Sequence, residues 1–172
     1  MSTMSLPAIE FRPLEAAPSS SVCTLHNDAQ VKRHMPLASG VFDEAAYRAW
    51  LAGKEALRRQ HGYAPWSIWV DGAFAGWGGF QFESGDPELA LVLAPTFWGY
   101  GKVIYDELIR RAIEMWGFES IVVLLPPQRL RRRVLLRLGY VEEGVVEVEG
   151  QPFIRFRSRL DRRPERIRTT YF

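Results

Sequence analysis

The chain has 172 residues, of which 47% are hydrophobic and 24% are charged, and its formal net charge at pH 7 is +2. This length fits one domain with a proper hydrophobic core, and so small a net charge gives no argument for a nucleic-acid partner. The only cysteine, Cys23, excludes a disulfide framework and a cysteine-rich metal site.

The first part of the chain predicts one strand and two helices. The N-terminal segment lacks the pattern of a signal peptide, and no apolar run approaches the roughly 20 residues that span a bilayer, so we expect a cytoplasmic protein without membrane contact. Alternation predicts a strand over Ile9–Leu14, and Ser19–Val31 has a weak helical pattern. A stronger helix follows over Phe42–Gly62, with Asp43 as its N-cap. The apolar stripe of this helix consists of Tyr47, Trp50, Leu51, Ala56 and Leu57.

The middle of the chain predicts a hairpin, a strand and a long helix. The hairpin covers Trp66–Phe82, because Asp71-Gly72 lies between two apolar runs and is a pair that tight primed turns prefer. Glu88–Leu93 is another strand. From Gly101 the apolar residues recur at helical spacing, and Gly117 ends the helix. The aromatic residues of the hairpin, which we expect mainly in the core, are Trp66, Trp69, Trp77, Phe80 and Phe82.

The last part of the chain predicts a buried strand, a helix and a second hairpin. Ser120–Leu125 is a continuous run of β-branched residues and leucine, as in a strand buried on both faces. Pro126-Pro127 ends it, and the following helix closes at Gly139. The final hairpin turns near Glu149-Gly150. This order of elements predicts a mixed α/β sheet.

Two glycines, Gly99 and Gly101, stand where a strand passes into a helix. A helix start leaves about four backbone N–H groups without partners, and glycine lets an anion approach them closely. The stretch is therefore a candidate cradle for a pyrophosphate, with a simple turn as the alternative. A dinucleotide-binding fingerprint would need a third glycine where Ile104 stands, and a P-loop would need Ser or Thr at Val103.

Three stretches carry a resemblance to a known family. APTFWGYGKVIYDELIRRAIE, at Ala94–Glu114, resembles the acetyl-CoA-binding motif of GNAT N-acetyltransferases and is similar to their Rim-type branch, which acts on ribosomal proteins and small molecules. QRLRRRVLLRLGYVEEG, at Gln128–Gly144, resembles the second segment of that family. LHNDAQVKRHM, at Leu25–Met35, is similar to the same branch. Together with the element order, the resemblance covers Ile9–Ser158.

The resemblance implies a single-domain α/β fold and a binding site for acetyl-CoA. The sheet would be mixed and mostly antiparallel, splayed at a central parallel strand pair and flanked by about four helices. Pantetheine would lie in the wedge and the pyrophosphate on the amides at the helix start, with no metal required. The implied acetyl-CoA-binding residues are Leu91, Val92, Leu93, Trp98, Gly99, Tyr100, Gly101, Lys102, Gln128 and Arg131.

The sequence departs from the family pattern at several positions. Thr96 replaces the usual Gln or Arg of the loop. In the second segment, Gln128 stands for Asn, Arg131 stands for Ser, and Leu135 occupies the usual tyrosine position. Tyr140 occupies a position that is normally a structural Phe. The residue that would protonate the departing thiolate is therefore unassigned.

Acetyl transfer from acetyl-CoA to a primary amine is the function that the resemblance implies. The acceptor would be a small molecule or a protein N-terminus, and its amine must lose a proton. The resemblance places the base at Glu88, with an exposed strand-end carboxylate as the other interpretation and Glu83 as a second candidate. His26 and His34 fall near the expected amine side, whereas His61 follows a helix. The alternative function is a non-catalytic acyl-CoA-binding sensor or partner-binding module on the same fold.

The C-terminus differs from the rest of the chain in its arginine content. We expect an acetyltransferase domain over residues 1–158 and an Arg-rich tail over residues 159–172. A basic arm of this kind is either a solvated end or a docking element for an anionic partner such as RNA, although nucleic acid is not expected overall. The sequence leaves a homodimer open.

Overall fold

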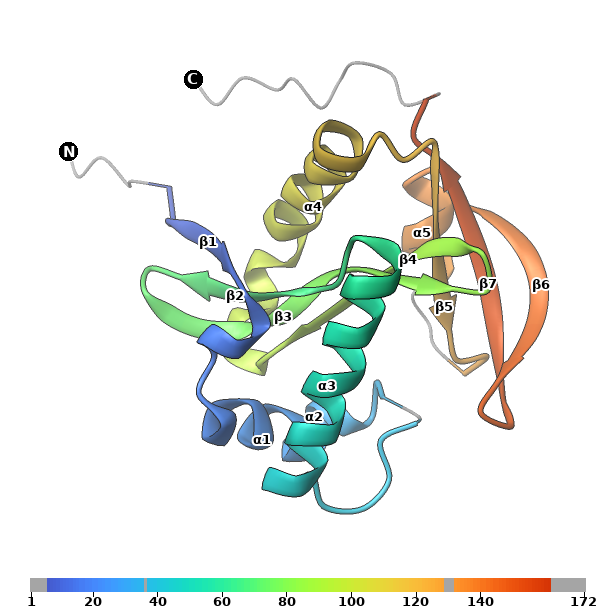
Figure 1. Ribbon diagram of the computed structural model, residues 1–172. Coiled ribbons are helices and arrows are strands. Elements are labelled where there is room, and N and C mark those ends of the chain that lie inside the picture. Colours follow the sequence, from blue (N-terminus) through green and yellow to red (C-terminus); the bar gives the residue numbers. More distant parts are fainter. Residues whose placement is uncertain (1–5, 36, 129–131, 162–172) are drawn as a thin grey trace.

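The computed structural model describes residues 6–35, 37–128 and 132–161, and it shows one seven-stranded sheet in the order β1-β2-β3-β4-β5-β7-β6 (Figure 1). All neighbouring strands are antiparallel except the central pair β4 and β5. The strands are β1 (Ile9–Arg12), β2 (Trp66–Val70), β3 (Ala73–Glu83), β4 (Asp86–Leu93), β5 (Ser120–Leu125), β6 (Val141–Val148) and β7 (Gln151–Arg159). The predicted mixed, mostly antiparallel sheet with a central parallel pair is confirmed.

Helices accompany the sheet on both faces. The α-helices are α1 (Ser19–Asn27), α2 (Ala29–Lys32), α3 (Glu44–His61), α4 (Gly101–Trp116) and α5 (Arg132–Arg137). Two 3-10 helices are η1 (Leu14–Ala16) and η2 (Pro95–Tyr100). The described residues thus form five α-helices where about four were expected. None of these helices has the length and apolar character needed to cross a bilayer.

Asp28 accounts for the additional helix. The sequence predicted one helix over Ser19–Val31, but the backbone of Asp28 is extended, with ψ at 128°. Its carboxylate accepts hydrogen bonds from the N–H groups of Gln30 and Val31 at 2.8 and 3.0 Å. Asp28 is therefore the N-cap of a second helix, a role that its short acidic side chain favours over a place in a helix interior.

Tight turns join the antiparallel strands at the positions where the sequence has Gly after a small or acidic residue. Asp71 and Gly72, between β2 and β3, have φ values of 50° and 79°, as the predicted primed turn requires. Ser84 and Gly85 have φ values of 49° and 90° and connect β3 to β4 in the same way. The sequence predicted the first turn and missed the second, so the direct pairing of β3 with β4 is a finding of the structure.

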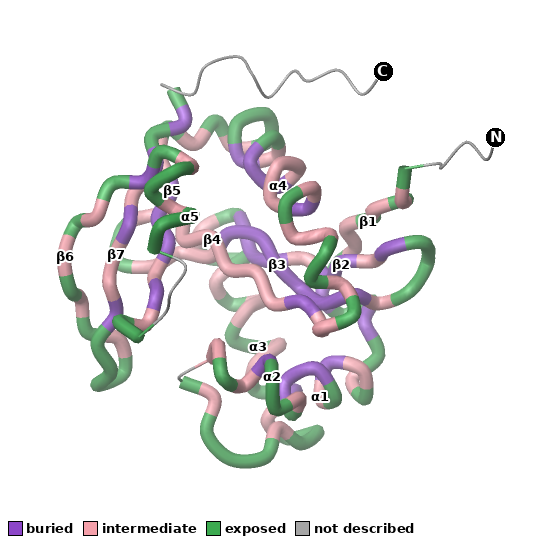
Figure 2. The backbone as a smooth tube through the Cα atoms, turned by 180° about the vertical axis from the view of Figure 1, so that it is seen from behind, coloured by how far each residue is buried: buried purple, intermediate pink, exposed green. Residues whose placement is uncertain are grey.

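The sheet separates two groups of helices. On one face α4 contributes Ile104, Leu108 and Ile109 to a core that also contains Phe80 of β3, and all four side chains are fully buried. On the other face α1, α2 and α3 pack against the sheet (Figure 1), with Trp77 of β3 in that smaller core. Figure 2 shows the buried stretch of β3 between these two layers. Burial on both sides fixes which face each β4 side chain occupies.

A wedge opens between β4 and β5. The two strands share one register pair, Glu88 with Val122, whereas β3 pairs with β4 along the whole strand. The backbone of β4 beyond Glu88 therefore has no partner in β5.

Ion pairs tie the closed end of the wedge together. Arg157 of β7 donates to both oxygens of Asp86 at 2.8 and 2.9 Å, and Arg155 pairs with Asp86 and with Glu143 of β6. Arg157 also pairs with Glu143. We call Asp86, Glu143, Arg155 and Arg157 the base cluster. It links the start of β4 to strands on the far side of β5.

The described fold ends just after β7. Arg159 is still in the strand, Leu160 is buried, and the Leu160 N–H donates to the Glu119 carbonyl at 2.8 Å. The hypothesis of an Arg-rich docking arm falls mainly on residues 162–172, which lie outside the described residues.

Candidate functional site

The backbone of β4 presents polar groups to the wedge at alternate residues. The N–H of Ala94 donates to the Ala75 carbonyl at 2.9 Å, so this pair belongs to the hydrogen-bonded set of the β3–β4 ladder. Hydrogen-bonded and non-bonded pairs alternate in an antiparallel ladder. The polar groups of Val92 therefore point to β3, and those of Leu91 and Leu93 point into the wedge. Of the three residues expected to bind pantetheine, two present their backbone there.

A pocket of about 140 Å³ lies at the open end of this wedge. It joins the end of β4 to the start of α4 and to the segment around α2. Its lining consists of Val31, His34, Met35, Leu91, Val92, Leu93, Trp98 and Gly101. The structure thus brings together five of the residues that the sequence assigned to acetyl-CoA: three from β4, one from η2 and one from α4. Gly99, Tyr100 and Lys102 lie next to these in the chain but do not line the pocket.

The two glycines at the mouth of α4 keep space free outside the protein. Neither Gly99 nor Gly101 has a positive φ, and a Cβ added to either would meet no atom within 4 Å among the described residues. Neither backbone strain nor internal packing therefore requires glycine at these positions. Both positions leave room for close approach by a group from outside, as a phosphate cradle needs.

The start of α4 is suited to hold an anion. No side chain caps this helix at Tyr100, and the helix dipole places partial positive charge at its start. The 3-10 helix η2 runs directly into α4, and the amide of Gly101 donates to the Trp98 carbonyl. Lys102 adds a positive charge whose Nζ lies 2.7 Å from Asp106. The cradle thus consists of the helix start and a nearby ammonium, without the Gly101 amide.

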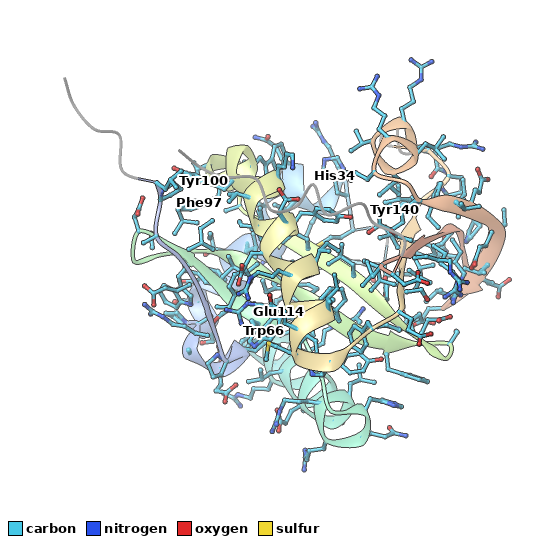
Figure 3. The ribbon with its side chains drawn as sticks, turned by 90° about the horizontal axis from the view of Figure 1, so that it is seen from above. His34, Trp66, Phe97, Tyr100, Glu114 and Tyr140 are labelled. Atoms are coloured by element: carbon cyan, nitrogen blue, oxygen red, sulfur yellow. The ribbon has the colours of Figure 1, made fainter. Side chains whose placement is uncertain are left out.

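Trp98 ties the loop to the strand. Its indole Nε1–H donates to the Leu93 carbonyl at 2.9 Å, and 38% of the residue remains exposed. The ring also meets His34 edge-on, with centroids 5.9 Å apart. In Figure 3 His34 lies at the same end of α4 as Tyr100, while Glu114 lies at the other end. The sequence placed His34 near the acceptor side, and the structure puts it in the pocket wall.

Glu88 lies at the closed end of the wedge and not in the pocket itself. It is half-buried on the sheet face that α3 covers, and its Oε2 accepts a hydrogen bond from Gln81 Nε2 at 2.9 Å. Burial raises the pKa of Glu88, and the bond from Gln81 partly offsets that effect. A carboxylate with a raised pKa suits a general base near neutral pH.

Lys54 of α3 completes a polar group that the sequence analysis missed. Its ammonium donates to Gln81 Oε1, and its Nζ lies 5.2 Å from the centroid of the Trp77 ring. Burial lowers the pKa of Lys54. A signal was present, because Lys54 falls within the apolar stripe of its helix, three residues after Leu51. A lysine in such a stripe indicates either a covering stem or a buried polar contact.

Two histidines have structural roles. His26 is 3% exposed, and its Nε2 accepts a hydrogen bond from Trp77 Nε1 at 3.0 Å. Burial lowers the pKa of His26 to about 4, so the ring is neutral near pH 7 and fixed as an acceptor. His61 stacks on Phe82 with centroids 3.7 Å apart.

No described residue of the second family segment, Gln128–Gly144, lines the pocket. Gln128 is exposed in the connection after β5, and Arg131 lies outside the described residues. Tyr140 is buried, and its hydroxyl lies 2.9 Å from that of Tyr105 on α4. Neither tyrosine lines the pocket. Glu83, the second candidate base, bonds to the neighbouring Ser84 hydroxyl. Among the residues described, no group of three or more His, Cys, Asp and Glu could hold a metal ion.

Comparisons with known proteins agree with this geometry. The family model described as Acetyltransferase (GNAT) domain matches residues 9–141. No curated protein sequence matches the chain.

Solved structures match over most of their length. An acetyltransferase from Agrobacterium tumefaciens is 16% identical, with a TM-score of 0.68 over 92% of this chain and 96% of that one. RimL, a ribosomal L7/L12 alpha-N-protein acetyltransferase in complex with coenzyme A, is 18% identical, with a TM-score of 0.67 over 89% and 94%. The microcin C7 self-immunity acetyltransferase MccE, in complex with acetyl-CoA and AMP, is 15% identical, with a TM-score of 0.66 over 88% and 92%. At these identities the likeness shows the fold.

Proposed function

Because this chain belongs to the GNAT acetyltransferase family, we propose that it transfers acetyl from acetyl-CoA to a primary amine, with Glu88 as the general base. The observation that carries the proposal is the pocket at the open end of the wedge, where Leu91 and Leu93 meet Gly101 at the start of α4. The backbone of β4 faces this cavity beside the start of α4, where no side chain caps the helix. A sheet with a purely structural role would normally have this strand paired or covered.

The residues present fit coenzyme A. The backbone groups of Leu91 and the N–H of Leu93 would bind the pantetheine amides as a neighbouring strand would. Val92 lines the pocket with its side chain. The junction of η2 and α4, from Gly99 through Lys102, would hold the pyrophosphate at the positive end of the helix, without the Gly101 amide. Tyr100 lies within this segment, and Gln128 and Arg131 belong to the same proposal through the family resemblance alone.

The chain would supply a general base and a hydrogen-bond donor to the thioester carbonyl. When bound, acetyl-CoA supplies a thioester whose carbonyl carbon is open to attack by an amine nitrogen. Glu88 would take the proton that the amine loses, directly or through water. A backbone N–H of β4 that faces the wedge and is not engaged by pantetheine would donate to the thioester carbonyl oxygen as negative charge develops. As the new C–N bond forms, the C–S bond breaks and coenzyme A leaves.

The relatives indicate the acceptor of this chain only as a broad class. The name of RimL gives a protein N-terminus as its acceptor. We propose a small molecule or a protein N-terminus for this chain, in line with its similarity to the Rim-type branch. The carboxylate of Glu88 on the acceptor side favours an acceptor that arrives as an ammonium ion.

Turnover tests the proposal. The purified protein is incubated with acetyl-CoA and a panel of amines that includes amino acids, polyamines and short peptides, and free thiol is measured. Release that depends on one amine class, and that falls in Glu88→Gln, is the expected result. Tight acetyl-CoA binding without release on any amine would instead support the non-catalytic sensor.

A further inference from the structure

We propose that Lys54 and Gln81 form a positioning relay that holds Glu88 through one carboxylate oxygen and leaves the other oxygen for the acceptor amine. The proposal rests on the proposed function, because it assigns to Glu88 the task of accepting a proton. Neither Lys54 nor Gln81 touches the reacting atoms in this scheme. Both act through Glu88, so they are positioning residues.

The three side chains come from three different elements. Gln81 of β3 and Glu88 of β4 are register partners, so their side chains leave the sheet on the same face. Gln81 Nε2 donates to Glu88 Oε2 at 2.9 Å, and Lys54 Nζ of α3 donates to Gln81 Oε1. No hydrogen bond from a residue that the structure describes reaches the other oxygen, Oε1. The relay therefore engages one side of the carboxylate.

Charge fixes the orientation of the Gln81 amide. Its oxygen is an acceptor and must face the Lys54 ammonium, while its NH₂ group is a donor and must face the Glu88 carboxylate. The reversed amide would place donor against donor at one end and acceptor against acceptor at the other. In the observed orientation the amide dipole directs its positive end at Glu88. This favours the ionised carboxylate, which is the form that accepts a proton.

The far end of the relay is anchored. The ammonium of Lys54 lies 5.2 Å from the Trp77 ring centroid, a cation–π contact, and Trp77 is itself held by His26 at 3.0 Å. A lysine that only covered apolar surface would extend its ammonium into water. Lys54 instead brings its charge to Gln81, so α1 and α3 both contribute to the position of Glu88.

The charged groups around Glu88 act on it in opposite directions. Burial raises its pKa and the Gln81 bond lowers it; among the charges, Glu83 on β3 raises the pKa, and Lys54 on α3 and Arg155 on β7 lower it. Arg155 is already paired with Asp86 and Glu143 in the base cluster. Removing Gln81 or Lys54 must therefore shift the Glu88 titration upward, and removing the Glu83 charge must shift it downward.

Carbon-13 NMR of labelled glutamate carboxyl groups tests the relay without turnover. The Glu88 resonance is assigned by its loss in Glu88→Gln. We expect Glu88 to titrate at higher pH in Gln81→Met and in Lys54→Met, each of which keeps most of the side-chain volume. The matched control, Glu83→Gln, should move the titration to lower pH. Gln81→Asn, which keeps the amide but shortens its reach, should behave like Gln81→Met.

Kinetics give the second readout. In Gln81→Met and Lys54→Met the acid limb of kcat/KM should move to higher pH, with a loss of up to about tenfold on the acid side that shrinks as the pH rises. A role in packing alone would lower the rate equally at all pH values.

An unchanged Glu88 titration in Lys54→Met, Gln81→Met and Gln81→Asn would overturn the relay. Failure of the proposed function is a separate result. It would appear as an absence of acetyl transfer by the wild-type protein, while the NMR titration still decides the relay.

Discussion

Gly99 and Gly101 leave space at the N-terminus of α4, although the backbone conformation does not require glycine at either position. The sequence predicted a cradle from the two glycines alone, with a simple turn as the alternative. In the structure neither residue has a positive φ and neither lies against an internal atom, so both positions have room for either interpretation. Glycine at such positions permits an outside group to approach the backbone closely.

Gly101→Glu should remove acetyl-CoA binding and leave the fold intact. The new side chain would fill the cradle and oppose the pyrophosphate charge. We expect affinity to fall by about 100-fold, which corresponds to about 3 kcal/mol. Isothermal titration calorimetry measures the affinity. The control is Gly53→Glu on α3, where a Cβ also meets no atom within 4 Å. Equal affinity in the two variants would contradict the cradle.

Gly76 is required for the opposite reason. Its φ is 151°, and a Cβ there would lie 2.0 Å from the Val92 carbonyl oxygen on β4. Gly76→Ala should therefore lower the free energy of unfolding by about 2 kcal/mol or more, through backbone strain and overlap. Urea denaturation measures the loss. Gly53→Ala, in the interior of α3, should raise stability by about 0.5–1 kcal/mol.

At the scale of single elements, η2 and its tryptophan set the geometry of the entrance. Trp98 reaches back from η2 to the Leu93 carbonyl, so a side-chain hydrogen bond ties the loop to the end of β4. The sequence pattern does not reveal such a bond, because the partners are five positions apart, across a loop residue and part of a 3-10 helix. The sequence therefore identified Trp98 as part of the motif, and the structure supplies its hydrogen bond.

Trp98→Phe should weaken acetyl-CoA binding without unfolding the protein. The ring remains, but the donor to Leu93 is lost, which costs about 1 kcal/mol and corresponds to about fivefold in affinity. Calorimetric titration gives the affinity, and thermal unfolding shows whether the fold persists. If the affinity stays at the wild-type value while the unfolding midpoint is unchanged, the indole bond has no part in ordering the entrance.

Most elements could be predicted from local pattern, and the relations between them could not. A glycine turn between apolar runs, a continuous β-branched run and a change to helical spacing placed β2, β3, β5 and α4 correctly. The break at Asp28 was missed because a capping aspartate and a helical aspartate look alike in sequence. The contact of Lys54 with Gln81 joins residues 27 positions apart, and no periodicity reports which stripe residue faces which strand. The wedge was expected only through the family resemblance.

At the scale of the whole molecule, the base cluster holds the two halves of the sheet together where the wedge closes. Asp86 and Glu143 each bond to both arginines, which hold the pKa of each carboxyl below its usual range. A depressed folded-state pKa stabilises the protein above the unfolded-state pKa, and this stability is lost as the pH falls through the folded-state value. The cluster thus contributes to stability at neutral pH and loses that contribution in acid.

Asp86→Asn should show this dependence. We expect the variant to be less stable than the wild type by about 1–3 kcal/mol at about pH 7, because it leaves two arginines without that carboxylate. The difference should shrink as the pH falls below about 4, where the carboxyl of the unfolded chain becomes protonated, and it should vanish once the pH passes below the depressed pKa of the folded-state carboxyl. Urea denaturation at a series of pH values measures it, with Asp161→Asn, an exposed position just after β7, as the control. A difference that is constant with pH would show that Asp86 contributes by packing rather than charge.

The inward direction of the Leu91 and Leu93 backbone has a further consequence, for self-association. Unpaired strand groups on an outer edge invite other molecules to add a strand, and proteins suppress this with short or charged edges. The two outer strands here follow that rule, since β1 has four residues and β6 carries Glu142, Glu143 and Glu147. The groups of β4 need no such defence, because β5 and α4 enclose them. The protein can therefore keep unpaired backbone groups on β4 for an extended ligand without exposing an edge strand that promotes aggregation.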